Sequence, residues 1–228
     1  MPRSLFDALE RRGVSVFQTW GMTEAPGASR ATPPPGSADE PPELQLALKR
    51  DRQGRAHALV RIMIVGETGE RLPKNGEAIG RLHVGGPMVT ARYLNEPESG
   101  AVRWLDTGDI ARIFADGTIE IVDRAKDIIK SGGEWISSLE IESAAASHPA
   151  VAAAAVIGVH HEKWQERPSL LCMLRIGVAV GADALREHLA VRLPRWWLPD
   201  EIRFVEFMPL TATGKIDKGV LRRRFGVA

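Results

Sequence analysis

Short runs in which hydrophobic and polar residues alternate dominate the first half of the chain, a pattern typical of half-buried β-strands. A short helical pattern over residues 4–12, ending at Gly13, precedes most of them. The Asp-Gly pair in "ADGT" predicts a tight hairpin. We therefore expect a β-rich region up to residue 122, with strands at 14–17, 44–48, 58–65, 78–86, 111–114 and 118–122.

From residue 123 onward the pattern changes to strands that alternate with helices. Ser137 and Glu140 form a capping-box pattern, which predicts a helix from there to about Ser147. A second helix is expected over 182–193, with Asp183 as its cap. Together with a last helix at 218–225, strands at 151–159, 169–177 and 201–207 predict a small α/β domain with a three-stranded sheet and flanking helices. The fold class is therefore α/β, a mixed α+β arrangement.

The composition suits two small domains or one large one, since the chain has 228 residues of which 44% are hydrophobic and 26% charged. A net charge of +1 gives no reason to expect a nucleic-acid or anionic-membrane partner. The sequence has no apolar run of membrane-spanning length and no apolar signal core near its start, so we expect a cytoplasmic protein. The proline-rich segment 31–43 is predicted to be a surface loop.

The single cysteine and the six histidines do not indicate a metal or disulfide site. Cys172 lies in an apolar run, so it is expected to be a buried small hydrophobic residue and not a nucleophile. The histidines lack metal-ligand spacing, and adjacent His160 and His161 would point in different directions on a strand.

The segment "TWGMTE" combines an aromatic residue, a glycine, a hydroxyl group and a carboxylate. A purine could stack on Trp20, Thr23 could donate to a phosphate, and Glu24 could help to hold Mg²⁺. The segment could equally be a turn that happens to carry a carboxylate.

Three further segments carry polar groups that could take part in chemistry. "WLDTGD" places Asp106 and Asp109 around a turn, where capping of the turn is the alternative. "PLTATGKIDK" presents Lys215, a compact cation that suits phosphate, although exposed lysines are common. "DRAKDIIKSGGEW" places Gly132–Gly133 after a cationic strand, and a simple hairpin turn would explain the two glycines as well.

The order and spacing of these segments change the interpretation. The series "WGMTE … GRLHVGGP … WLDTGD … DRAKDIIKSGGEW … PLTATGK" resembles the adenylate-forming superfamily of acyl-CoA synthetases, luciferases and peptide-synthetase adenylation domains, most closely its medium- and long-chain fatty-acyl-CoA ligases. The resemblance implies an acid–thiol ligase that forms an acyl-adenylate from ATP and then an acyl-CoA. It also implies that residues 1–122 end a large AMP-binding domain, 123–126 form a hinge, and 127–228 form the small C-terminal domain.

The resemblance implies a role for each residue that matches a nucleotide motif. Asp109 would accept hydrogen bonds from the ribose hydroxyls, and Arg124 would lie beside the same sugar. Thr23 would lie at the phosphates and Glu24 at Mg²⁺. The adenine site would be lined by Trp20, Gly21 and Met22.

The resemblance also implies how coenzyme A would be used. Lys126 would be the pivot about which the small domain swings between half-reactions. Lys215 would be the catalytic lysine of adenylation, and Lys130 would face the adenylate after the swing. The channel for the pantetheine arm would be bordered by Gly132, Gly133 and Glu134.

Two parts of the family's pattern are missing from this sequence: the Ser/Thr/Gly-rich phosphate loop and the region that supplies most of the acyl pocket. We therefore expect the chain to be the C-terminal portion of a synthetase, with Met1 an internal methionine, and to be unable to complete the reaction alone. Partners would be a carboxylate such as a fatty acid, ATP and coenzyme A, with a separate N-terminal chain as a further candidate. The alternative is a non-catalytic nucleotide- or coenzyme A-binding or regulatory protein.

Overall fold

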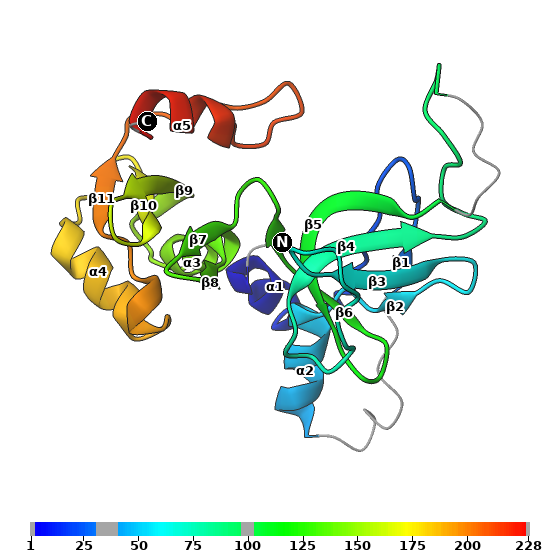
Figure 1. The fold of residues 1–228 in the computed structure, drawn as a ribbon. Coiled ribbons are helices and arrows are strands. Elements are labelled where there is room, and N and C mark those ends of the chain that lie inside the picture. The colour runs from blue at the N-terminus through cyan, green and yellow to red at the C-terminus, as the bar shows by residue number, and fades with distance from the viewer. Residues whose placement is uncertain (1–2, 31–40, 97–102, 227–228) are drawn as a thin grey trace. The chain divides into compact units, whose positions relative to one another are not determined.

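The chain folds as two compact units in the computed structural model, which describes residues 3–30, 41–96 and 103–226 (Figure 1). Leu9–Ala125 forms the first, which we call the β-rich unit, and Lys126–Ala228 together with Met1–Ala8 forms the second, the α/β unit. The division falls between Ala125 and Lys126, inside the segment proposed as a hinge.

The β-rich unit is built on a four-stranded antiparallel sheet in the order β3-β4-β5-β6. Alternate residues of its strands, such as Ile62 and Ile64, or Leu82 and Val84, are buried in one hydrophobic cluster, as the alternating pattern predicts. Strand β1, which follows the "TWGMTE" segment in the sequence, pairs antiparallel with β2 in a separate two-stranded sheet. The strands are β1 Ser29–Arg30, β2 Arg55–Ala56, β3 Arg61–Val65, β4 Gly80–Gly85, β5 Leu105–Ile113 and β6 Ile119–Arg124.

The predicted hairpin at "ADGT" is confirmed between β5 and β6. Gly117 has a φ of +82°, which an L-residue rarely adopts. The Asp116 carboxylate accepts a hydrogen bond from the Thr118 amide at 2.9 Å, which closes the turn.

Two strand predictions in this unit are wrong. Residues 44–48 lie in a helix, α2 Pro42–Asp51, because Pro42 suits the first turn of a helix and the leucine, alanine and glutamine residues that follow are good helix formers. Residues 14–17 form no strand; Val14 and Phe17 are exposed and follow the end of α1 Arg3–Glu10. Most of the predicted loop 31–43, namely 31–40, lies outside the described residues.

The α/β unit contains a five-stranded sheet, two strands more than predicted. The central strand β10 pairs with β9 in antiparallel and with β11 in parallel orientation, and these three strands are the ones that the sequence predicts. The additional strands are so short that they carry no periodic signal. The strands are β7 Ile129–Ser131, β8 Glu134–Ile136, β9 Val151–His161, β10 Gln165–Leu174 and β11 Glu201–Phe204.

Helices cover both faces of this sheet (Figure 1). Val156 and Leu170 point toward α3 and α4, whereas their neighbours Ile157 and Leu171 pack in the cluster that includes Leu221 of α5. Continuous apolar strands are therefore required, because both faces are buried. The helices are α3 Ser138–Ala146, α4 Ala182–Ala190 and α5 Lys218–Phe225.

Of the two helix caps predicted in this unit, one is confirmed and one is wrong. The Ser137 hydroxyl accepts from the Glu140 amide at 3.2 Å, which confirms the predicted start of α3. Asp217 caps α5 in the same way. Asp183 does not cap α4, because the cap position is Gly181, which has no side chain to accept a hydrogen bond.

Cys172 lies in the α3–α4 side of the core and is fully buried, as predicted. Burial raises the pKa of its thiol to about 12, so the nucleophilic thiolate is suppressed.

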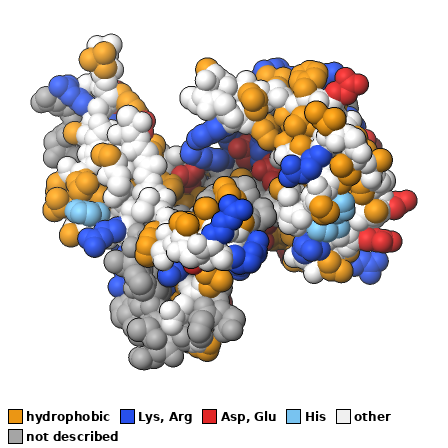
Figure 2. All heavy atoms as spheres, turned by 180° about the vertical axis from the view of Figure 1, so that it is seen from behind, with side chains coloured by type: hydrophobic (Ala, Val, Ile, Leu, Met, Phe, Trp, Pro, Cys, Tyr) orange, Lys and Arg blue, Asp and Glu red, His pale blue; other side chains and the backbone are white. Residues whose placement is uncertain are grey.

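Charged side chains of both signs are interspersed on the face seen in Figure 2, in keeping with the near-neutral balance of the sequence. Among the residues with described structure, none of the helices combines the length and apolar character needed to cross a bilayer.

Candidate nucleotide and coenzyme A sites

Asp109 lies in strand β5 directly opposite Arg124 of β6. The segment "WLDTGD" is therefore not the turn that the sequence suggests, although it contains the local hydrogen bonds of one. The Gly108 amide donates to Asp106 at 2.9 Å, and the Asp109 amide donates to the Thr107 hydroxyl at 3.1 Å. The segment is nevertheless a strand, because β4 and β6 pair with it on either side. Register shifts in both pairings make this stretch of strand irregular.

Asp109 is only 3% exposed, which is unusual for an acidic residue. The Trp20 indole N–H donates to Oδ2 at 2.8 Å. Arg124 Nε lies 2.8 Å from Oδ1 as an ion pair, but the N–H is not aligned with that oxygen, so Oδ1 accepts no hydrogen bond from the described part of the chain. A buried carboxylate oxygen without a donor is suited to accept one from a ligand hydroxyl.

Burial raises the pKa of Asp109 above its ordinary value, and the nearby Asp123 acts in the same direction. The hydrogen bond from Trp20 and the charge of Arg124 oppose this shift without cancelling it. The site therefore holds a carboxylate at an energetic cost, a common feature of functional sites.

The loop that carries Trp20 is held tightly by backbone contacts. The Trp20 amide donates to Ser29 Oγ at 2.8 Å, and the Ser29 amide returns a bond to the Trp20 carbonyl at 2.9 Å. A Cβ atom on Gly21 would lie 2.8 Å from the Gly27 nitrogen, so only glycine fits there. Met22 and Ala25 exchange two backbone hydrogen bonds. This loop is thus a turn, as the alternative reading has it, and the turn fixes the position of Trp20.

Glu24 is fixed at the end of this loop by two contacts. Its backbone carbonyl accepts from the Thr90 amide at 2.7 Å, and its carboxylate accepts from the Tyr93 hydroxyl at 3.0 Å. The bond to Glu24 raises the pKa of Tyr93. The structure thus joins Trp20, Asp109 and Arg124 by direct contact and places exposed Thr23 next to Glu24 on the same loop.

Two of the supporting residues were missed by the sequence analysis. Ser29 belongs to no recognisable motif, and Tyr93 offered only the signal of being the single tyrosine of the chain. Ser29 contacts Trp20 from nine positions away and Tyr93 contacts Glu24 from 69, and neither spacing belongs to a local helix or strand pattern.

The glycine pair forms a two-residue hairpin between β7 and β8, so the simple hairpin reading holds. Gly132 and Gly133 have φ values of +60° and +86°, the left-handed conformation that such turns require. Glu134, which follows, is exposed. The Lys130 ammonium lies 5.5 Å from the centre of the Trp135 ring, so this half-buried tryptophan contacts a cation beside the hairpin.

Exposed Lys126 lies between two anchored neighbours. The Ala125 amide donates to the Gly108 carbonyl at 2.8 Å, within the β-rich unit. Asp127 is buried and accepts from Arg222 of α5 at 2.5 Å, within the α/β unit.

Lys215 lies on the loop that precedes α5. The loop is closed by the Thr211 amide, which donates to the Lys215 carbonyl at 2.7 Å, and by the Lys215 amide, which donates to Thr211 Oγ at 3.2 Å. The Lys215 side chain is exposed, and its ammonium has no ion-pair partner within the described ranges.

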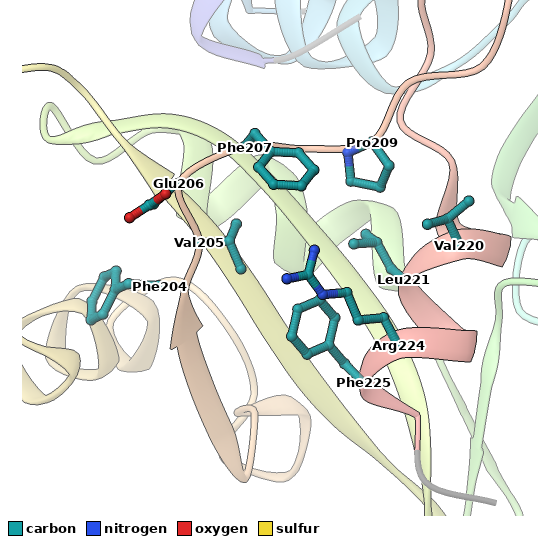
Figure 3. Close-up of a pocket in the computed structure, with 9 residues that line it drawn as sticks. All are labelled: Phe204, Val205, Glu206, Phe207, Pro209, Val220, Leu221, Arg224 and Phe225. Atoms are coloured by element: carbon teal, nitrogen blue, oxygen red, sulfur yellow. The ribbon is translucent and has the colours of Figure 1, made fainter.

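A pocket of about 270 Å³ lies between α5 and the segment after β11 (Figure 3). The Arg224 guanidinium points into it between the Phe207 and Phe225 rings (Figure 3), 5.5 Å and 5.2 Å from their centres. None of the predicted site residues lines this pocket, so it is separate from the sites proposed here.

Comparison with known proteins agrees with the motif pattern. The AMP-binding enzyme family matches residues 1–94, and the AMP-binding enzyme C-terminal domain matches residues 140–215. This chain belongs to the adenylate-forming enzyme superfamily. The predicted resemblance and fold class are thereby confirmed.

Several relatives are acyl-CoA ligases. The chain is 42% identical to the medium-chain-fatty-acid–CoA ligase of Ectopseudomonas oleovorans, over 94% of this chain and 40% of that protein. It is 37% identical to the long-chain-fatty-acid–CoA ligase of Thermus thermophilus, over 98% of this chain and 42% of that protein. Our chain thus spans about two fifths of the length of these relatives.

Among solved structures, o-succinylbenzoate CoA synthetase from Bacillus subtilis in complex with its acyl-adenylate intermediate is similar with a TM-score of 0.80 and 29% identity, over all of this chain and 44% of that one.

Proposed function

We propose that this chain is the C-terminal portion of an ATP-dependent fatty-acyl-CoA ligase. The observation that carries the proposal is the buried Asp109 carboxylate, held by Trp20 and retaining an oxygen without a donor, in a chain 42% identical to a medium-chain ligase. The alternative of a non-catalytic binding protein is not favoured, because the curated relatives reported above are named as ligases.

In the proposed adenylation step, a substrate carboxylate oxygen attacks the α-phosphorus of ATP while the bond to pyrophosphate breaks. Asp109 accepts from the ribose hydroxyls and orients the nucleotide, with Arg124 beside the sugar and Trp20, Gly21 and Met22 along the adenine. Lys215 supplies a positive charge that offsets charge developing on the phosphate and carboxylate oxygens.

A magnesium ion in the proposed reaction would be held by Glu24 and the substrate phosphates, with Thr23 nearby. Ions of this kind are commonly bound by one carboxylate plus phosphate oxygens. The Glu24 carboxylate is suited to this role, since the Tyr93 hydroxyl engages only its Oε1 atom. The ion would neutralise phosphate charge.

In the proposed second step, the thiolate of coenzyme A attacks the acyl carbonyl carbon, and AMP departs with its oxygen. Rotation of the small domain about Lys126 would remove Lys215 from the reaction site and bring in the face of that domain that carries Lys130. The Gly132–Gly133 hairpin and Glu134 would border the pantetheine arm, because glycines allow close approach to the backbone.

Calorimetric titration of the chain with AMP tests the nucleotide site. We expect Asp109→Asn to weaken AMP binding by about tenfold or more, since it replaces a charged acceptor that receives ligand hydroxyls. Asp106→Asn is the matched control, because Asp106 lies on the same strand but pairs with Arg81 at 2.6 Å. Equal AMP affinity in the parent and Asp109→Asn would exclude the proposed role of Asp109.

The activity itself is tested by supplying the part of a ligase that this sequence lacks. Joined to the upstream region of the Ectopseudomonas oleovorans enzyme, or co-expressed with it as a separate chain, the protein should support fatty-acid-dependent exchange of pyrophosphate into ATP. The isolated chain should not. Exchange by the isolated chain at the rate of the joined protein would contradict the proposal.

A further inference from the structure

The guanidinium of Arg167 on β10 is the centre of a polar cluster beside the glycine hairpin. Only 9% of this residue is exposed. Its Nη1 atom donates to Ser131 Oγ at 3.2 Å and to the Trp196 carbonyl at 3.0 Å. Its Nη2 atom donates to the Leu198 carbonyl at 3.2 Å and to the Asp200 carboxylate at 2.9 Å.

The remaining donor, Nε of Arg167, also reaches Asp200, at 3.0 Å. All five N–H groups of the guanidinium are therefore used, and its charge is balanced by a carboxylate. A lysine at this position has three donors in a different geometry and could not replace this set.

An aromatic chain extends from the same arginine to the hairpin. The Arg167 guanidinium lies 4.6 Å from the centre of the Trp196 ring, and Trp196 meets Trp164 edge to face at 4.8 Å. The Trp164 carbonyl accepts from the Gly132 amide at 3.0 Å, and a Cβ on Gly132 would lie 2.9 Å from the Trp164 ring. The Trp196 indole N–H has no partner in the described structure, so packing alone orients this ring.

Arg167 thus contacts the hairpin by two routes: directly through Ser131, and through the two tryptophans to Gly132. The hairpin needs such support because two consecutive glycines restrict the backbone less than any other pair of residues. Ser131 is fully buried, so the direct contact is shielded from water.

We propose that Arg167 is a positioning residue that fixes the Ser131–Gly133 turn for the approach of coenzyme A. This inference rests on the proposed function of the hairpin as a border of the pantetheine channel. Arg167 does not touch the thiol in this proposal; it acts through Ser131 and Trp164.

The test uses the whole chain and two serine substitutions. Ser131→Ala removes the direct contact and leaves the other four donors of Arg167 in place. Ser169→Ala is the matched control: Ser169 is buried on the same strand as Arg167, and its hydroxyl has no hydrogen-bond partner among the described residues. Coenzyme A affinity is measured by calorimetry, and hydrogen exchange of the Gly132 amide by NMR.

We expect Ser131→Ala to weaken coenzyme A binding by about tenfold and to speed exchange at Gly132 by a similar factor, the effect of one lost charge-assisted hydrogen bond. Exchange of the Leu170 and Ile202 amides in the β10–β11 pair should not change, which separates a local effect from general destabilisation. Ser169→Ala should behave as the parent does. Arg167→Lys, if it folds, should weaken binding at least as much as Ser131→Ala.

Two negative results can be told apart. If the parent chain binds coenzyme A and Ser131→Ala binds it with the same affinity, the positioning role of Arg167 is overturned, but the proposed role of the hairpin is not. Failure of the parent chain to bind coenzyme A would overturn the proposed role of the hairpin, and the inference with it.

Discussion

The strand pair β5–β6 and the loop before α5 present their charged groups in opposite ways. Asp109 is buried, paired in register with Arg124 and bonded to Trp20. Lys215 projects from a closed loop, and its ammonium has no partner within the described ranges. The carboxylate is thus held in place by the fold, whereas no side chain in the described ranges pairs with the Lys215 ammonium.

Lys218, three residues after Lys215, shows that the exposure of Lys215 is not a general property of this segment. Its ammonium lies 2.6 Å from the Glu142 carboxylate and 2.7 Å from Ser138 Oγ, with the side chain 12% exposed. The Lys218 side chain anchors α5 to α3, whereas Lys215 contributes only its backbone to the loop before α5. The difference identifies Lys218 as a structural residue and leaves the Lys215 ammonium available for the role proposed above.

The largest expected effect is that of Lys215→Met in the joined enzyme. Loss of one preorganised charge should lower the adenylation rate by about 10²–10³-fold. The free energy of unfolding should stay unchanged, because the Lys215 side chain makes no described contact within the chain. Pyrophosphate exchange and urea unfolding measure these quantities, with exposed Lys74→Met as control. A loss of stability in Lys215→Met would contradict the contrast between the two regions.

Lys218→Met should lower the stability of the fold, the property that Lys215→Met leaves unchanged. We expect the free energy of unfolding to fall by about 1–3 kcal/mol, because Glu142 is left partly buried without its cation. Urea unfolding of the isolated chain measures this, and Lys215→Met provides the comparison. Equal stability of the two variants would show that the Lys218–Glu142 pair contributes nothing.

The two glycines of the hairpin offer a finer comparison. Gly133→Ala should cost about 1 kcal/mol, since a Cβ meets no atom within 4 Å and only the left-handed backbone is strained. Gly132→Ala should cost more, because its Cβ would also press against Trp164 at 2.9 Å. Urea unfolding distinguishes them, and an equal or smaller loss in Gly132→Ala would mean that the Trp164 ring moves aside.

The smallest effect concerns pH. The pKa of Asp109 is raised on folding, so the folded chain binds more protons at this site than the unfolded chain. The contribution of Asp109 to the free energy of unfolding therefore falls as the pH rises from the ordinary pKa of this group, 3.8, through its raised pKa in the folded chain. Asp109→Asn removes that loss and should be at least as stable as the parent at pH 7. Unfolding of both proteins between pH 4 and 7 tests this; a variant that loses stability steadily relative to the parent as pH rises would contradict it.

The sequence was sufficient for the parts of the fold that depend on periodicity and local caps. The apolar runs at 151–159 and 169–177 became β9 and β10, and Ser137 begins α3 as its capping box predicts. The strand prediction at 44–48 was wrong because the apolar positions there also fit a helix, and Pro42 favours the start of a helix. The strands β7 and β8 are too short for a periodic signal and exist because Gly132 and Gly133 form a hairpin.

The candidate sites were found from motifs, but their support was not. Nothing local in the sequence connects Trp20 with Asp109, 89 positions apart, or Ser131 with Arg167, 36 apart. Such contacts depend on strand register and tertiary packing. The burial of Asp109 and the orientation of Arg124 beside its Oδ1 atom are likewise defined only in the folded chain.

The anchoring of both neighbours of Lys126 limits how the chain can turn there. Ala125 is tied to β5 through Gly108, and Asp127 is tied to α5 through Arg222. In the proposed hinge, so few free torsions would restrict any reorientation at Lys126 to a narrow arc. A one-residue insertion beside Lys126 would change the direction of that arc as well as its reach.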